Sequence, residues 1–153
     1  MRYLFQTFRG KTPVCCFRVD ESKQKEYDMN KDQLNLLCNE VRESGYELHR
    51  YLRHGHLEKI YENGLSNRLL KKGIRVSQQI PVQVEDEDGT VLGEMKADLL
   101  VENEILIELK AVETIHPSHV AQLLGYLRAT GLKYGLLINF GAPRFAIKRY
   151  ILD

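Results

Sequence analysis

The sequence predicts an α/β domain in which a mixed β-sheet is flanked by helices. Apolar residues recur every three or four positions over residues 31–52, which is typical of an amphipathic helix. They follow a strand pattern over residues 74–112 and form a short, buried-looking strand at 134–140. The expected order is therefore helix, helix, three strands, helix and two strands. A chain of 153 residues with 43% hydrophobic residues can bury a core without a structural metal or disulfide.

Two helices are expected ahead of the first strand. Asn30 can cap the first helix, and Gln33 can reach back as its capping-box partner. The stretch RHGH at 53–56 interrupts the helical pattern. The second helix should follow it and end at Gly73, because glycine readily takes the left-handed conformation that closes a helix.

Turn residues divide the next segment into a three-stranded meander. DEDG at 86–89 is typical of one hairpin turn, and ENE at 102–104 of the next. Helical spacing returns at 116–131, where Gly131 marks the helix end. The apolar stretch YGLLINF and an edge strand at 145–152 complete the order.

Loop length in the second hairpin decides which side chains share a face. With a three-residue loop centred on Asn103, which tolerates a left-handed backbone, Val101 pairs with Ile105. Asp98 then lies directly opposite Glu108. A two-residue loop would shift the register by one and scatter the apolar side chains. The three-residue loop is favoured because it collects on one face only apolar residues: Ala97, Leu99, Val101, Ile105, Ile107 and Leu109.

Asp98, Glu108 and Lys110 gather on the other face of this hairpin. Two carboxylates so close repel each other, and one would be driven protonated unless a cation lies between them. Oxygen ligands with room for water suit Mg²⁺ or Mn²⁺. Lys110 would lie where it could orient an attacking water or stabilise charge that develops at phosphorus. The group is therefore suited to metal-assisted hydrolysis of a phosphodiester bond.

Asp98, nine intervening residues and then Glu108-Leu109-Lys110 resemble the motif of the PD-(D/E)XK nuclease superfamily. The stretch GHLEKIY at 55–61 resembles the signature of the GxxExxY protein family, which is usually grouped with those nucleases. The resemblance covers about residues 30–152 and implies a restriction-endonuclease-like core.

The resemblance also implies roles for individual residues. Asp98 and Glu108 would be metal ligands, helped by the backbone carbonyl of Leu109. Glu58 would approach the metal from its helix, directly or through water, and Gln122 would flank the site from the later helix. An isolated acid and lysine on a strand are more often a solvated face, but the full set reverses that reading. The chain departs from the family motif before Asp98, where alanine replaces proline.

The leading functional hypothesis is a Mg²⁺-dependent nuclease, with nucleic acid as its partner and DNA favoured over RNA. The formal net charge of +1 supplies no general attraction to nucleic acid. The alternative is therefore a catalytically silent module that keeps the nuclease fold and binds nucleic acid or a protein partner. A homodimer is compatible with either hypothesis.

Residues 1–28 are expected to be an appendage to a nuclease-like domain at 29–153, either flexible or absent from the native protein if Met29 is the start. The three cysteines Cys15, Cys16 and Cys38 lack zinc-site spacing and favour a reducing compartment. No apolar run approaches the length of a membrane span, so we expect a cytoplasmic protein.

Overall fold

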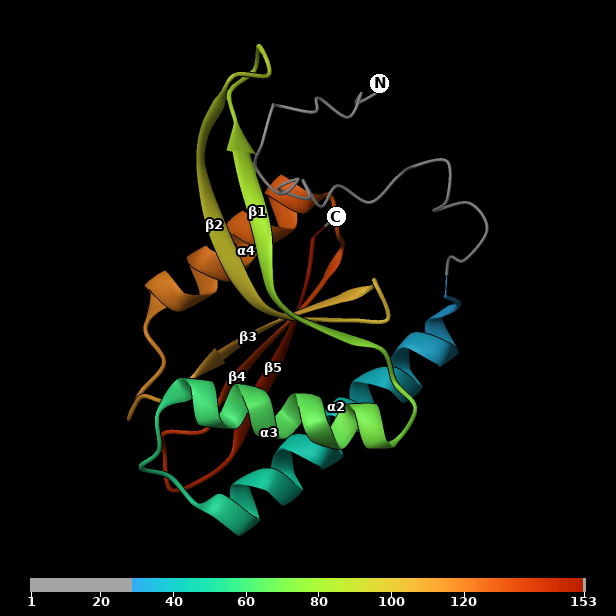
Figure 1. The fold of residues 1–153 in the computed structure, drawn as a ribbon, viewed down its shortest axis with the longest axis vertical. Coiled ribbons are helices and arrows are strands. Elements are labelled where there is room, and N and C mark those ends of the chain that lie inside the picture. The colour runs from blue at the N-terminus through green and yellow to red at the C-terminus, as the bar shows by residue number, and fades with distance from the viewer. Residues whose placement is uncertain (1–28, 153) are drawn as a thin grey trace, which may run out of the picture.

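The computed structural model describes residues 29–152, which fold around a five-stranded sheet with the strand order β1-β2-β3-β4-β5 (Figure 1). Helices α2 and α3 pack on one face of the sheet and α4 on the other. The predicted appendage at 1–28 lies outside the described residues. The element order agrees with the prediction, and the bounds are α2 Lys31–Leu52, α3 Glu58–Lys71, β1 Val76–Glu85, β2 Val91–Val101, β3 Ile105–Lys110, α4 Pro117–Thr130, β4 Tyr134–Asn139 and β5 Ala146–Ile151.

The sheet is mixed, as predicted. Strands β1, β2 and β3 form an antiparallel meander. Helix α4 then carries the chain across to β4, which pairs parallel to β3, and β5 returns antiparallel to β4 as an edge strand. Strand β3 is therefore central, with a hydrogen-bonded neighbour on each side.

Local capping explains where the helices begin and end. The predicted capping box of α2 is present, because Asn30 Oδ1 accepts the N–H of Gln33 at 2.8 Å and Gln33 Oε1 accepts the N–H of Asn30 at 3.0 Å. Helix α4 is capped by His116, whose Nδ1 accepts the N–H of Ser118 at 3.2 Å. It ends at Gly131, which has a φ of +74°. None of the helices in residues 29–152 is long and apolar enough to span a membrane.

Two hydrophobic clusters fill the two faces of the sheet. One lies beneath α2 and α3 and joins the helix residues Leu48, Tyr61 and Leu65 to strand residues such as Ile107. The other lies beneath α4 and joins its residues, and Leu132 just after it, to residues of β1, β2 and β3: Ile80, Val82, Ala97, Leu100, Leu106, Tyr126, Leu127 and Leu132.

The predicted hairpin register is confirmed, since Val101 pairs with Ile105 and Leu99 with Ile107. Asn103 has the expected positive φ of 59°. The ladder between β2 and β3 ends after three pairs, however, so Asp98 does not pair with Glu108 as expected. Instead, the Asp98 carboxylate accepts a backbone hydrogen bond at this position, as described below.

Ala97 corrects a second expectation. We expected it on the face of Leu99, but it packs in the cluster beneath α4. Regular alternation fails because β1 is kinked at Gln79, which has a φ of +53°. The pairing of β1 with β2 passes over Gln79 and Asp98, so both strands exchange their inward faces at this kink.

Gly141 provides a test of the close packing beside β3. A Cβ atom at Gly141 would overlap the backbone of Ala111 and Val112, whereas one at Gly125 in α4 would enter open space. We expect Gly141→Ala to lower the free energy of unfolding by at least about 2 kcal/mol, because backbone cannot move aside cheaply. Gly125→Ala should raise it by about 0.5–1 kcal/mol. Urea denaturation of both variants checks this, and equal effects would contradict the close approach.

Candidate active site

The candidate site lies at the carboxyl end of the central strand β3. Glu108 and Lys110 share one face of this strand, as alternation predicts, and Lys110 Nζ lies 2.7 Å from Glu108 Oε1. Their side chains are only 3% and 12% exposed, respectively. Burial lowers the affinity of Lys110 for its proton, but the hydrogen bond from Lys110 to Glu108 and the charges of Glu108, Glu58 and Asp98 together hold the pKa of Lys110 above its usual range. Lys110 is therefore an ammonium group at neutral pH.

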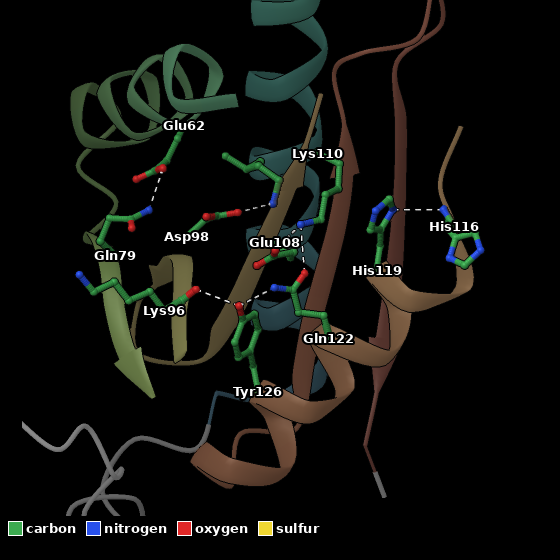
Figure 2. A network of polar contacts seen from close by, with 11 residues as sticks. Glu62, Gln79, Lys96, Asp98, Glu108, Lys110, His116, His119, Gln122 and Tyr126 are labelled. Atoms are coloured by element: carbon green, nitrogen blue, oxygen red, sulfur yellow. Dashed lines mark hydrogen bonds and ion pairs between the residues drawn. The ribbon is translucent and has the colours of Figure 1, made fainter. Parts of the chain in front are cut away.

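Helix α4 adds a chain of polar contacts to this ion pair (Figure 2). Lys110 Nζ donates to Gln122 Oε1 at 3.0 Å, and Gln122 Nε2 donates to the hydroxyl of Tyr126 at 2.8 Å. Tyr126 in turn donates to the carbonyl of Lys96 at 2.9 Å. Burial raises the pKa of Tyr126 to about 12, so its hydroxyl stays protonated. The structure thus brings Gln122 to Lys110, and it adds Tyr126, which sequence reasoning missed.

Asp98 joins the site from the kinked part of β2. Its Oδ2 accepts the N–H of Leu109 at 2.7 Å, immediately beyond the end of the β2–β3 ladder. Burial raises the pKa of Asp98 to about 6, against the opposing effect of the Leu109 N–H. The negative charges of Glu58 and Glu62 add to this rise. The surroundings of Asp98 therefore contain too little positive charge and too few donors to stabilise its ionised form.

Glu108 is more deeply buried than Asp98. Burial, followed by the charge of Asp98, raises its pKa to about 7. Lys110 occupies one of its oxygens, but no donor from residues 29–152 reaches Oε2, although this atom is buried. A buried carboxylate oxygen without a partner is costly, so this atom marks a place where a cation or a proton would be stabilised.

Glu58 is the first residue of α3 and is half-buried. The loop before it is fixed by Tyr61, whose hydroxyl donates to the carbonyl of Arg53 at 2.6 Å and accepts the N–H of His56 at 3.2 Å. Gly55 within the loop has a φ of +113°, which favours glycine. The charge of Glu58 raises the pKa of both strand acids, so this anchored loop brings the carboxylate close to the site.

The side chains present fit a hard divalent cation. Asp98 and Glu108 offer carboxylate oxygens with raised pKa, and Glu108 Oε2 has no other partner within the described residues. Across residues 29–152, no three His, Cys, Asp or Glu side chains gather closely enough to hold a metal by themselves. A cation here would therefore keep water in several positions, which is the behaviour of Mg²⁺ rather than of Zn²⁺.

Sequence reasoning also missed Glu62, which is 2% exposed and lies one turn after Glu58. Its carboxylate binds side chains from β1 and contributes to the raised pKa of Asp98. A sign of it was present in the sequence, since Glu62 is an acid between Tyr61 and Leu65 on the apolar stripe of the second helix.

A mixed sheet with helices on both faces and an acidic site at the end of its central strands is an α/β fold with a restriction-endonuclease-like core. The model of the PD-(D/E)XK nuclease superfamily matches residues 35–150. The chain belongs to this superfamily. The narrower resemblance to GxxExxY proteins stays a prediction.

Solved structures of similar fold include the crystal structure of SSO0001, at 24% identity and a TM-score of 0.51, over 63% of this chain and 52% of that one. This chain thus spans about half the length of that protein, and the likeness supports the fold alone. An alkaline exonuclease, LHK-Exo from Laribacter hongkongensis, matches at 12% identity and a TM-score of 0.46, over 85% and 74% of the two chains. Its complex with dAMP matches at 12% identity and 0.42, over 74% and 81%. No curated protein sequence matches this chain.

The raised acid pKa values predict how stability depends on pH without metal. The pKa of Glu108 rises from 4.5 to about 7 on folding, so the native state binds more protons than the unfolded state between these values. The contribution of Glu108 to the free energy of unfolding is therefore fully present below about pH 4.5 and is lost as the pH rises through about 7. Glu108→Gln, which stays neutral, should stabilise the metal-free protein at pH 8 by on the order of 1–3 kcal/mol.

Urea denaturation in the presence of a chelator, from pH 5 to pH 8.5, measures this difference. The gap in unfolding free energy between Glu108→Gln and wild type should widen as pH rises. A gap that stays constant, or that closes at high pH, would show that Glu108 is not destabilised by ionisation.

Proposed function

We propose that this protein is a divalent-metal-dependent nuclease that hydrolyses phosphodiester bonds of nucleic acid. The observation that carries the proposal is the buried Oε2 of Glu108, which has no hydrogen-bond donor among residues 29–152 and lies in a site with Asp98 and Lys110. Such an arrangement lowers the stability of the fold. Because the chain belongs to a superfamily of nucleases, we interpret these costly charges as catalytic groups.

Asp98 and Glu108 would hold Mg²⁺, or Mn²⁺, with the carbonyl of Leu109, and Glu58 would contribute through water. The bound cation supplies positive charge that neutralises the phosphate and the charge developing at phosphorus. Glu58, Asp98 and Glu108 bring three carboxyl groups close to one ammonium group, Lys110, so a divalent cation would offset the excess of negative charge.

Lys110 would orient the attacking water through its ammonium group, which donates hydrogen bonds to Glu108 and Gln122 in the structure. Gln122 fixes the direction of that group, because its oxygen accepts from Lys110 while its amide nitrogen is held by Tyr126. We assign Glu58, Asp98, Glu108, Lys110 and Gln122 to the catalytic site on this basis.

We propose DNA rather than RNA as the substrate, and the cytoplasm as the location of the protein. The formal net charge of the chain is only +1, so binding of either nucleic acid must rely on local basic side chains. The alternative is a catalytically silent module of the same fold, acting as a monomer or homodimer that binds nucleic acid or a protein partner.

Cleavage of labelled DNA and RNA substrates, single- and double-stranded, with Mg²⁺ or Mn²⁺ tests the proposal. We expect the wild type to cleave and both Glu108→Ala and Lys110→Ala to lose at least about 10²-fold in rate, because the first removes a proposed ligand of the metal and the second removes the ammonium group that would orient the water. Glu113→Ala is the matched control, since this exposed acid lies five residues after Glu108, outside the polar network. It should keep the wild-type rate.

Calorimetric titration with Mn²⁺ separates the outcomes. Metal binding that is lost in Glu108→Ala, together with cleavage by the wild type alone, supports the proposal. A folded wild type that binds no divalent metal and cleaves none of the substrates would refute it and favour the silent module.

A further inference from the structure

Glu62 is a buried acid that binds two side chains of β1 and one of its own helix. Its Oε1 accepts from Gln78 Nε2 at 3.0 Å and from Lys59 Nζ at 2.7 Å, and its Oε2 accepts from Gln79 Nε2 at 2.9 Å. Figure 2 shows Glu62 reaching from α3 to Gln79, on the same side of the site as Asp98. Both carboxylate oxygens are thus occupied by donors of the chain, which distinguishes Glu62 from Glu108.

The two glutamine contacts require an unusual backbone. Successive residues of a strand point to opposite faces, so Gln78 and Gln79 would not both reach one carboxylate in a regular strand. They do so here because Gln79 has a φ of +53°. This left-handed conformation costs a residue with a side chain roughly 1–2 kcal/mol, and the surroundings must supply that free energy.

The kink at Gln79 has a direct consequence for Asp98. The β1–β2 ladder pairs Gln78 with Leu99 and Ile80 with Ala97, which places Gln79 and Asp98 across from each other at the point where pairing is interrupted. Asp98 is thereby released from the regular hairpin pattern, and its carboxylate turns to the N–H of Leu109.

We propose that Glu62 is a positioning residue: its carboxylate holds Gln79 in the left-handed conformation and so fixes Asp98 against the Leu109 amide. Glu62 acts on the metal site through the backbone and is not itself a ligand. This inference rests on the proposed function for its purpose, but the contact it describes exists without metal or substrate.

Rescue by glycine tests the causal chain. Glycine adopts a positive φ without the steric cost that glutamine bears, so Gln79→Gly should keep the kink without any help from Glu62. We expect Glu62→Ala, and to a smaller extent Glu62→Gln, to weaken Mn²⁺ binding by at least about tenfold, because Asp98 is no longer held in place. Adding Gln79→Gly to Glu62→Ala should restore most of that affinity.

Hydrogen exchange of the Leu109 amide in metal-free protein gives a readout that does not depend on activity. Its N–H is bound by Asp98, so Glu62→Ala should speed its exchange by at least about tenfold relative to the core amides of β4, and Gln79→Gly should reverse the change. Lys59→Ala is the matched control, since it removes a donor to Glu62 on a half-exposed side chain without touching β1. It should change both readouts less than about twofold.

Should Glu62→Ala not fold, the same comparison is made with Glu62→Gln alone and combined with Gln79→Gly. Unchanged Leu109 exchange and Mn²⁺ affinity in a folded Glu62 variant, or no rescue by glycine, would overturn the proposal and leave Glu62 a purely structural acid. A wild type that binds no divalent metal and cleaves no substrate would refute the proposed function, while Leu109 exchange would still decide whether Glu62 positions Asp98.

Discussion

The hydrogen bond from the Leu109 N–H to Asp98 is the contact on which the geometry of the site depends. The backbone ladder between β2 and β3 ends at Leu99 and Ile107, and the next N–H of β3 that faces β2, that of Leu109, would be left unpaired in a buried position. An unpaired buried N–H costs about 1–3 kcal/mol, so a side-chain acceptor at this point is strongly favoured. Because that acceptor is a carboxylate, the contact that completes the sheet also brings negative charge to the end of β3.

The same arrangement opposes stability through its electrostatics. Burial makes ionisation of Asp98 and Glu108 unfavourable, and each charge disfavours the other. Lys110 compensates Glu108 through one oxygen, while the second oxygen remains without a donor among the described residues. A hydrophobic replacement of such a pair is often neutral or stabilising, so folding alone does not explain these charges. A divalent cation would relieve the repulsion between the acids and supply the missing partner at once.

The sequence predicted the elements that depend on local patterns. The α2 capping box, the three-residue loop at Asn103 and the pairing of Val101 with Ile105 follow from turn chemistry and apolar alternation, and all are present. Ala97 was misplaced because alternation assumes a regular strand, and a positive φ at a glutamine has no sequence signature. Glu62 was missed because its two partners on β1 are 16 and 17 residues away in the chain and become neighbours only after β1 folds against α3.

The acids of the site differ in how firmly the surrounding structure fixes their side chains, and this difference suits them to different tasks. Glu108 lies on the central strand and is paired there with Leu137 of β4, and Asp98 is fixed by the Leu109 amide, so these two carboxylates have little freedom. Glu58 begins a helix, is half-buried and makes no side-chain hydrogen bond within residues 29–152, although its loop is anchored by Tyr61. The two strand acids can therefore define where a cation lies, whereas Glu58 can adjust to it. A carboxylate without a fixed partner is suited to binding through water, because water tolerates the small differences in geometry that Mg²⁺ does not accept from a direct ligand.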